Sequence, residues 1–295
     1  SERTTGPLPQ AASSAASGAA RTMLRITDII GAPSREREWR AGLSPERHDG
    51  EVRFKTLADY RNQIRQITQQ GIVDIMLMSA SNVELLTDEG LFRDSAVKAS
   101  IRANDTTDIW VMRGATYSKQ PSLPFRTASL PRVMWGTTTP CPGAQVTGTD
   151  LGLYSITFNN NLDSDYASLL AFNEFRAEAA ACGFKYFLEV FNPNVDSGVD
   201  PEVLPHYIND CIVRCLAGVT KADRPEFLKI AYNGPKALEE LASFDPSLIV
   251  GVLGGGAGTT RDCFELLHQA ERYGARVALF GRKINLAESP LAMVA

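Results

Sequence analysis

Short apolar runs alternate with amphipathic segments along the chain from Met23 onward. The runs are rich in Val, Ile, Leu and Phe, which is typical of strands buried on both faces of a parallel sheet. Each run is bounded by residues that favour turns or helix starts, so we expect each to form one strand. The expected strands are Leu24–Ile30, Val73–Met78, Ile109–Arg113, Leu153–Phe158, Tyr186–Phe191, Phe227–Tyr232, Leu248–Leu253 and Val277–Phe280.

The segments between most of these runs carry apolar residues at helical spacing. Thr56 is suited to cap the first helix and Gly71 to end it, whereas Pro235 fits the first turn of a later helix. The remaining expected helices are Val83–Ala103, Asp163–Ala181, Pro201–Leu216 and Thr260–Tyr273. Strand–helix units in this order predict an α/β protein with a (β/α)8 TIM barrel, and a doubly wound open sheet is the alternative.

Two parts of the chain depart from a minimal barrel. Residues 1–21, rich in Ala, Ser, Gly and Pro, are expected to form a disordered tail before a single barrel domain over 22–295. Gly31–Asp49 is expected to be a long charged loop. Ala115–Asp150 is expected to be a long insert after strand 3, with loops and a strand at Arg132–Gly136 in place of a third helix. Long loops at the carboxyl face of a barrel are often functional.

Composition narrows the possible partners. The 295 residues are 44% hydrophobic and 22% charged, with a net charge of −4 and no dominant basic cluster, so no nucleic-acid partner is expected. No apolar stretch reaches the ~18 residues of a membrane helix, so no membrane partner is expected. Five cysteines without a CxxC pair and three scattered histidines give no metal-binding pattern. Such cysteine usage suits a reducing, cytoplasmic location.

Lys229 lies inside the apolar run Phe227–Tyr232. A lysine is almost never buried unless it is paired or functional. Burial disfavours the ammonium form of an amine and so favours the neutral form that attacks a carbonyl. The alternatives are a lysine paired with a carboxylate and one whose stem passes the strand end. Glu189 interrupts the neighbouring run Tyr186–Phe191 in the same way, so in a barrel the two side chains are expected to face each other, either for proton transfer or for neutralisation.

Two turns near the carboxyl end suggest a phosphate site. A glycine run, Gly254–Gly258, follows the seventh expected strand, and Gly281-Arg282 follows the eighth. The loops after these strands often hold phosphate in barrel enzymes, and backbone N–H groups of glycine turns can approach an anion. The glycine run alone is equally consistent with a turn that binds nothing, but the combination favours phosphate. Asp28 and Arg113, near the ends of strands one and three, are further candidates for the same mouth.

Three segments together resemble the class I aldolases of the archaeal fructose-bisphosphate aldolase type, which are related to deoxyribose-phosphate aldolase. They are Phe227–Gly234, Val250–Gly255 and Ala278–Ile284, similar to the family's strands six, seven and eight. The resemblance implies an imine-forming lysine at Lys229. It also implies that substrate phosphate is held by Gly255, Gly256, Gly281 and Arg282, and that Asp28 corresponds to the family's acidic residue at the end of strand one.

The implied activity is that of a Schiff-base-forming class I aldolase, a carbon–carbon lyase acting on a phosphorylated ketose or similar sugar phosphate. Such an enzyme needs no metal or organic cofactor, and its subunits are expected to form a homo-oligomer. The family's fifth strand carries a Trp and a proton-transferring Tyr, whereas this chain has Glu189 and neither aromatic residue. One alternative is therefore an isomerase or acyltransferase in which Lys229 and Glu189 act as acid and base. The other is a barrel that binds a phosphosugar without catalysis.

Overall fold

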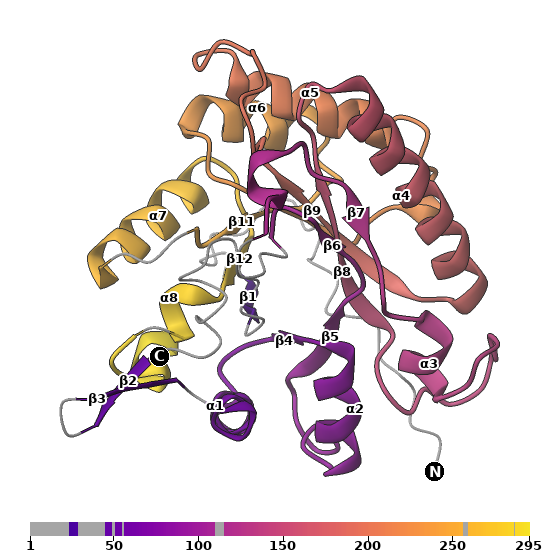
Figure 1. Cartoon of the computed structure of the whole chain (residues 1–295), viewed down its shortest axis with the longest axis vertical. Coiled ribbons are helices and arrows are strands. Elements are labelled where there is room, and N and C mark those ends of the chain that lie inside the picture. The colour runs from indigo at the N-terminus through magenta and orange to yellow at the C-terminus, as the bar shows by residue number, and fades with distance from the viewer. Residues whose placement is uncertain are drawn as a thin grey trace, which may run out of the picture.

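In the computed structural model, eight parallel strands close into a barrel that is surrounded by helices (Figure 1). The structure describes residues 56–109, 115–255, 259–285 and 287–295, together with the backbone of 24–28, 45–48 and 51–54. Around the barrel, the strands follow the order β1 (Leu24–Asp28), β12 (Val277–Phe280), β11 (Val250–Leu253), β10 (Leu228–Ile230), β9 (Lys185–Phe191), β8 (Leu151–Thr157), β5 (Lys98–Arg102) and β4 (Ile75–Met78).

The described chain also contains helices and two small antiparallel sheets. The α-helices are α1 (Leu57–Gln70), α2 (Ala80–Asp88), α3 (Leu130–Trp135), α4 (Leu162–Cys182), α5 (Leu204–Leu216), α6 (Pro235–Phe244), α7 (Thr260–Arg272), α8 (Arg282–Asn285) and α9 (Pro290–Val294). Single turns of 3-10 helix are η1 (Tyr117–Lys119) and η2 (Lys221–Asp223). The small sheets pair β2 (Pro45–His48) with β3 (Glu51–Phe54) and β6 (Asp105–Thr106) with β7 (Pro124–Phe125).

The predicted parallel barrel is confirmed, and with it most of the strand and helix positions. Thr56 caps α1 by accepting a hydrogen bond from the backbone N–H of Asp59, and Asp59 bonds back to the N–H of Thr56. Gly71 ends that helix in the left-handed region, at φ 69°. The open-sheet alternative is wrong, because β1 pairs with both β12 and β4 and so closes the barrel.

The third strand was predicted at the wrong place. The strand between β4 and β8 is β5, Lys98–Arg102, and not Ile109–Arg113. Of the expected helix Val83–Ala103, only the first part is helical: it belongs to α2, which ends at Asp88, shortly before Gly90 at φ 83°. Ile109 lies in a turn, and residues 110–114 lie outside the described part of the chain. The error has a physical reason: the apolar residues of 83–101 fit a helical period, and Gly90 is the residue that interrupts it.

Two expected loops contain regular structure. The charged loop Gly31–Asp49 includes β2, which forms a hairpin with β3. The segment between β5 and β8 holds the β6–β7 sheet and a short helix, α3, where a strand at Arg132–Gly136 was expected. A proline in the first turn of α3 and a left-handed Gly136 at its end favour the helix. The predicted tail over residues 1–21 lies outside the described residues.

The lumen of the barrel is divided into an apolar layer and a polar layer. Side chains on alternate positions of the strands pack into a cluster that contains no helix residue, which places it inside the barrel. Phe187 and Phe227 stack at its centre, with ring centroids 4.5 Å apart. Two residues further along their strands lie Glu189 and Lys229, so alternation directs both charges into the same lumen. The apolar layer therefore closes the amino end of the barrel below the charged residues.

The space between barrel and helices holds the larger core. Aromatic residues dominate it where α4 covers β8 and β9: Tyr154 stacks on Phe175 at 4.3 Å, and Phe175 meets Tyr186 edge-on at 5.3 Å. The Tyr186 hydroxyl donates to the carbonyl of Asp223 at 2.7 Å. Burial raises the pKa of both tyrosines, so they stay neutral phenols. This aromatic cluster packs α4 against β8 and β9, and β9 is the strand that carries Glu189.

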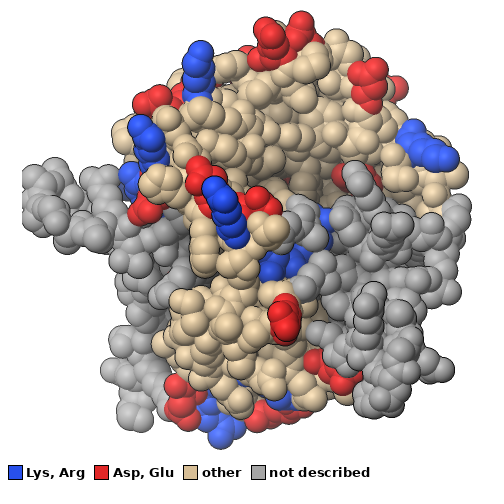
Figure 2. All heavy atoms as spheres, turned by 90° about the vertical axis from the view of Figure 1, so that its left-hand side faces the viewer, with Lys and Arg blue, Asp and Glu red and all other residues tan. Residues whose placement is uncertain are grey.

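The outer surface shows no field of a single sign on the face in Figure 2. Lys and Arg side chains are interspersed there with Asp and Glu, and uncharged residues separate them. None of the helices in the described ranges is long and apolar enough to pass through a bilayer. The charges that distinguish this protein lie inside the barrel.

Replacing Phe187 with Ala is expected to lower the free energy of unfolding by about 3–5 kcal/mol, because it opens a cavity in the lumen beneath the charged layer. Phe187 has no exposed surface, whereas Phe244 on α6 is 64% exposed. Phe244→Ala is therefore the matched control, with a change within about 0.5 kcal/mol. Urea unfolding followed by circular dichroism measures both, and equal effects would contradict the assignment of Phe187 to the lumen core.

Candidate active site

An ion pair between Lys229 and Glu189 lies at the centre of the candidate site. The two residues are register partners on β10 and β9, and Lys229 Nζ lies 2.9 Å from Glu189 Oε1. Their side chains are only 5% and 2% exposed. The juxtaposition expected from the sequence is present. The pair lies on the carboxyl side of the Phe187–Phe227 stack, which is the side of a TIM barrel where active sites are found.

The second oxygen of Glu189 is held by two other strands. The Ser155 hydroxyl, on β8, donates to Glu189 Oε2 at 2.6 Å. Arg102 Nη1, at the end of β5, donates to the same oxygen at 3.3 Å and to Ser155 Oγ at 3.3 Å. Both carboxylate oxygens are thus engaged, and only Oε1 faces the lysine. The orientation of the carboxylate is fixed by residues from three neighbouring strands.

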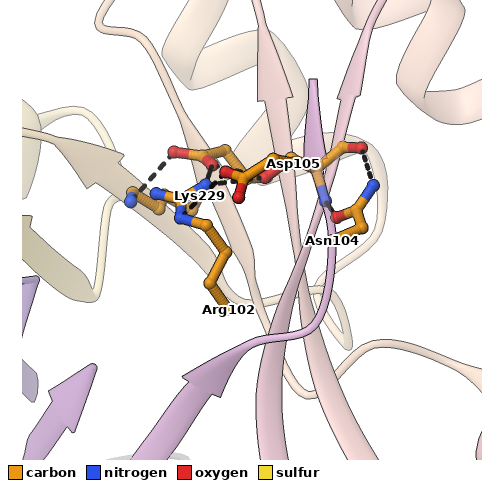
Figure 3. Close-up of polar contacts among 6 residues, drawn as sticks. Arg102, Asn104, Asp105 and Lys229 are labelled. Atoms are coloured by element: carbon orange, nitrogen blue, oxygen red, sulfur yellow. Dashed lines mark hydrogen bonds and ion pairs between the residues drawn. The ribbon is translucent and has the colours of Figure 1, made fainter. Parts of the chain in front are cut away.

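Arg102 connects this cluster to the mouth of the barrel. Its Nε lies 3.4 Å from Asp105 Oδ1 on β6, and its own side chain is 4% exposed against 34% for Asp105. Figure 3 shows the side chains of Arg102, Asp105 and Lys229 converging from different strands. Among the described residues, Lys229 and Arg102 pair here with Glu189 and Asp105. Counterions are needed at this place because an uncompensated buried charge is strongly destabilising.

Asn104 fixes Ser155 from the side. The regular pairing of β5 with β8 ends at Arg102 and Leu153. Beyond it, Asn104 Nδ2 donates to the Ser155 carbonyl at 2.9 Å, and its Oδ1 accepts from the Ser155 N–H at 2.6 Å (Figure 3). The amide of Asn104 therefore continues the ladder where the backbone of β5 turns away. As a result, the Ser155 hydroxyl stays aimed at Glu189.

Sequence reasoning missed Arg102, Ser155, Asn104 and Asp105. It expected an arginine at the end of the third strand, at Arg113, whereas the third strand of the barrel ends at Arg102. Arg113 itself lies outside the described residues. The signal for Arg102 was the same as for Lys229: a charge inside an apolar run, here 99–103, Ala-Ser-Ile-Arg-Ala. That signal was hidden by the helix expected over the same residues.

The candidate phosphate residues follow β11 and β12, the two strands that come after β10 along the chain. Leu253 on β11 pairs with Leu279 on β12, and the N–H of Gly254 donates to the Leu279 carbonyl at 2.9 Å. The turn with Gly255, at φ 63°, therefore lies beside Gly281, which precedes Arg282 at the start of α8. Gly256 lies outside the described residues. So does the side chain of Asp28, whose backbone ends β1 in register with Leu77 of β4.

The cysteines do not offer an alternative nucleophile at this site. All five are free thiols. Burial raises the pKa of Cys215 to about 12, and it also raises the pKa of Cys182, Cys211 and Cys263. A nucleophilic cysteine needs the thiolate form, which these environments disfavour. Among the described residues, no group of three or more His, Cys, Asp or Glu is arranged to hold a metal ion.

Comparison with known proteins supports the fold but not a specific activity. No protein-family model matches the sequence, and no curated protein matches it either. Among solved structures, an archaeal fructose 1,6-bisphosphate aldolase superposes with a TM-score of 0.63 at 13% identity, over 93% of this chain and 91% of the aldolase. Another archaeal fructose-1,6-bisphosphate aldolase structure, whose catalytic lysine is bound to the carbinolamine intermediate of the substrate, gives 0.62 at 13% identity, over 93% and 92%.

A third structure, the protein Cgl0159 of Corynebacterium glutamicum, gives a TM-score of 0.58 at 16% identity over 92% of this chain and 83% of that protein. At these identities, the likeness establishes a shared fold. The class that the structure defines is therefore a (β/α)8 barrel with the fold of the archaeal class I fructose-bisphosphate aldolases. The resemblance noted in the last third of the sequence extends, at the level of fold, over nearly the whole chain.

Glu189→Gln is expected to lower the free energy of unfolding by about 3–5 kcal/mol, because it leaves the buried Lys229 and Arg102 without their shared carboxylate. The matched control is Glu89→Gln, which breaks an ion pair with Arg65 of the same 2.9 Å length on the surface. There the denaturation midpoint should hardly change. Thermal and urea denaturation measure both variants. A Glu189→Gln protein as stable as the parent would show that the buried cations do not depend on this carboxylate.

Proposed function

We propose that this protein is a Schiff-base-forming class I aldolase, a metal-independent carbon–carbon lyase, acting on a phosphorylated ketose or a similar phosphorylated carbonyl compound. The observation that carries the proposal is the position of Lys229. This lysine is a buried amine, 2.9 Å from a carboxylate, in the charged layer on the carboxyl side of the barrel. The fold shared with Schiff-base-forming aldolases supports it. Asp28 is assigned to the same mouth by its position at the end of β1 and by the resemblance.

Catalysis would begin with proton transfer inside the ion pair. Glu189 Oε1 accepts a proton from Lys229 Nζ, and the neutral amine attacks the substrate carbonyl carbon. The carbinolamine then loses water to give a protonated imine. The imine accepts the electron pair of the bond that breaks between two carbons. Glu189 exchanges the protons of these steps because its Oε1 is the carboxylate oxygen that faces the reacting nitrogen.

Glu189 is also well placed to stabilise the charged intermediate. The protonated imine carries its positive charge on the former Lys229 nitrogen, so the carboxylate meets a cation both before and after imine formation. Ser155 and Arg102 hold Glu189 Oε2 throughout, so the carboxylate needs little reorientation during the reaction. A preoriented counterion of this kind contributes to catalysis most strongly where water is excluded, as in this nearly inaccessible layer.

The phosphate of the substrate would be bound at the turns after β11 and β12. Gly255 and Gly281 bring backbone N–H groups close together, and Arg282 adds a side chain able to bind phosphate through two parallel hydrogen bonds. Gly256 is assigned to the same turn by the resemblance. These turns follow β11, which is next to β10 in the barrel, and β12, which lies one strand further on. A phosphorylated substrate could therefore present its carbonyl to Lys229 while its phosphate remains near the rim.

A second candidate is acid–base catalysis without a covalent intermediate, as in an isomerase. The observation that favours it is the ion pair itself: Lys229 and Glu189 are already a matched acid and base, and the lysine is 5% exposed. In that case no carbonyl compound would become attached to Lys229. A barrel that binds a phosphosugar without turnover would give the same negative result and also no isomerisation.

Sodium borohydride is expected to trap a substrate on Lys229, because it reduces an imine to a stable secondary amine. The protein is treated with a panel of phosphorylated ketoses and smaller carbonyl compounds, and the adduct is located by peptide mass spectrometry. Lys229→Met should abolish the adduct and lower turnover by about 1,000-fold or more. Lys185→Met is the control, because Lys185 starts the neighbouring strand β9 at the opposite end of the barrel. An adduct that persists in Lys229→Met would refute the assignment.

Arg282→Ala is expected to weaken productive binding of phosphorylated substrates by at least about 10-fold, because the loss of even one charged hydrogen bond has that effect. The same variant should trap an unphosphorylated carbonyl compound as well as the parent protein does. Arg261→Ala, on the exposed start of α7, serves as a control for the loss of a positive charge from the same part of the molecule. KM values for a phosphorylated and an unphosphorylated substrate provide the measurement. Equal effects on both would place the phosphate elsewhere.

A further inference from the structure

The contact between Arg102 and Asp105 differs in kind from the other contacts of the site. Arg102 Nη1 and the Ser155 hydroxyl hold Glu189 deep in the lumen, where every partner is buried. Asp105 approaches the Nε of the same guanidinium from the side of the mouth, at 3.4 Å, and a third of its side chain is exposed. Asp105 lies on the two-residue strand β6, which follows the barrel strand β5 directly. Of these two carboxylates, that of Glu189 is thus fixed, and that of Asp105 borders solvent.

The exposed carboxylate is the one that can be exchanged. If Asp105 turns away, it moves toward water and its charge stays solvated, so the cost is that of a partly exposed ion pair. If Glu189 left, two buried cations would lose their counterion, which is far more costly. Another carboxylate can therefore take the place of Asp105 on the buried guanidinium, which exchanges one negative charge for another.

The guanidinium of Arg102 is also close to the reacting lysine. Arg102 and Lys229 bind opposite oxygens of the same carboxylate, so the guanidinium and the amine are neighbours across Glu189. A 2-oxo acid has its carboxylate bonded directly to the carbonyl carbon. Such a molecule can place its carboxylate on Arg102 while its carbonyl carbon meets Lys229 Nζ. A ketose with a hydroxymethyl group in that position brings no charge to take the place of Asp105.

We infer that Arg102 selects substrates with a carboxylate next to the carbonyl, and that Asp105 occupies the carboxylate position in the free protein. This inference rests on the proposed imine chemistry and narrows its substrate class to 4-hydroxy-2-oxo acids. The phosphate is then carried at the far end of the chain. Arginine suits this role, because a guanidinium matches the planar geometry of a carboxylate.

The reaction balances without a further reactant. Lys229 attacks C2 and water leaves, giving the protonated imine. Glu189 takes the proton of the C4 hydroxyl, the C3–C4 bond breaks, and C4 leaves as an aldehyde. The electron pair of that bond converts the imine to an enamine. C3 then receives a proton from Glu189, and water releases the shorter 2-oxo acid and restores the amine.

The test uses two carbonyl compounds that differ only in the group in question: pyruvate, with a carboxylate, and hydroxyacetone, with a hydroxymethyl group. Each is trapped on the full-length protein with borohydride, and the concentration for half-maximal labelling of Lys229 is measured by mass spectrometry. Pyruvate should be favoured by about 10- to 100-fold, the value of a charged pair of hydrogen bonds. Arg102→Gln should remove this preference.

A second variant keeps the test valid if Arg102→Gln does not fold. Asp105→Asn removes the competing carboxylate and should strengthen pyruvate trapping by about 2- to 5-fold, the value of a partly exposed ion pair. Hydroxyacetone trapping should not change. Asp150→Asn is the matched control, since Asp150 is 27% exposed and pairs with Lys98 at the opposite end of β5.

The outcomes separate this inference from the proposed function. A preference for pyruvate that Asp105→Asn strengthens supports both. Trapping of hydroxyacetone or of a phosphorylated ketose at least as readily as pyruvate, with no effect of Asp105→Asn, overturns the carboxylate role of Arg102 and leaves the aldolase proposal standing. If Lys229 forms no adduct with any compound of the panel, the imine chemistry fails, and the inference fails with it.

Discussion

The structure of the site depends on one carboxylate. Glu189 is the shared counterion of two buried cations, with Lys229 on one oxygen and Arg102 on the other. Its removal would leave both buried cations without their shared counterion, which is strongly destabilising. Ser155 supplies a further hydrogen bond to the same carboxylate, and Asn104 holds Ser155 in place. Three consecutive strands of the barrel, β8, β9 and β10, are therefore tied together at this height by polar contacts as well as by their backbone ladders.

The two layers of the lumen divide stability and chemistry between them. The apolar layer, centred on Phe187 and Phe227, provides the packing that a closed barrel needs and excludes water from below. The charged residues could not lie within the apolar layer, because charges next to the rings of Phe187 and Phe227 would have no counterion. Their position two residues further along each strand gives access from the carboxyl side while keeping the walls of the site on rigid strands. Pre-oriented catalytic groups require such a support.

The sequence predicts the barrel well because its strands carry their own signal. Lys229 and Glu189 could also be found from the sequence, since a charge inside an apolar strand contradicts its surroundings. Arg102 is harder to find from the sequence: its strand, Lys98–Arg102, is short and continues the apolar period of the preceding helix, so the pattern predicts a helix over the same residues. The contact of Asp105 with Arg102 could not be foreseen at all. It depends on the path of the chain after β5, and no pattern of residue types specifies that path.

In the proposed imine chemistry, a glutamate beside Lys229 makes other demands on the site than the aromatic proton donor expected from the resemblance would. A tyrosine beside the lysine would be neutral and would leave the amine without a counterion, whereas a glutamate stabilises the ammonium and thereby opposes the first step of imine formation. That opposition ends once the imine is protonated, because the new cation occupies the same place. Glu189 therefore stabilises the site most when the nitrogen of Lys229 carries a positive charge both before and after imine formation. The Arg102 guanidinium, which keeps Glu189 oriented, and the partly exposed carboxylate of Asp105 at the mouth are consistent with such a site.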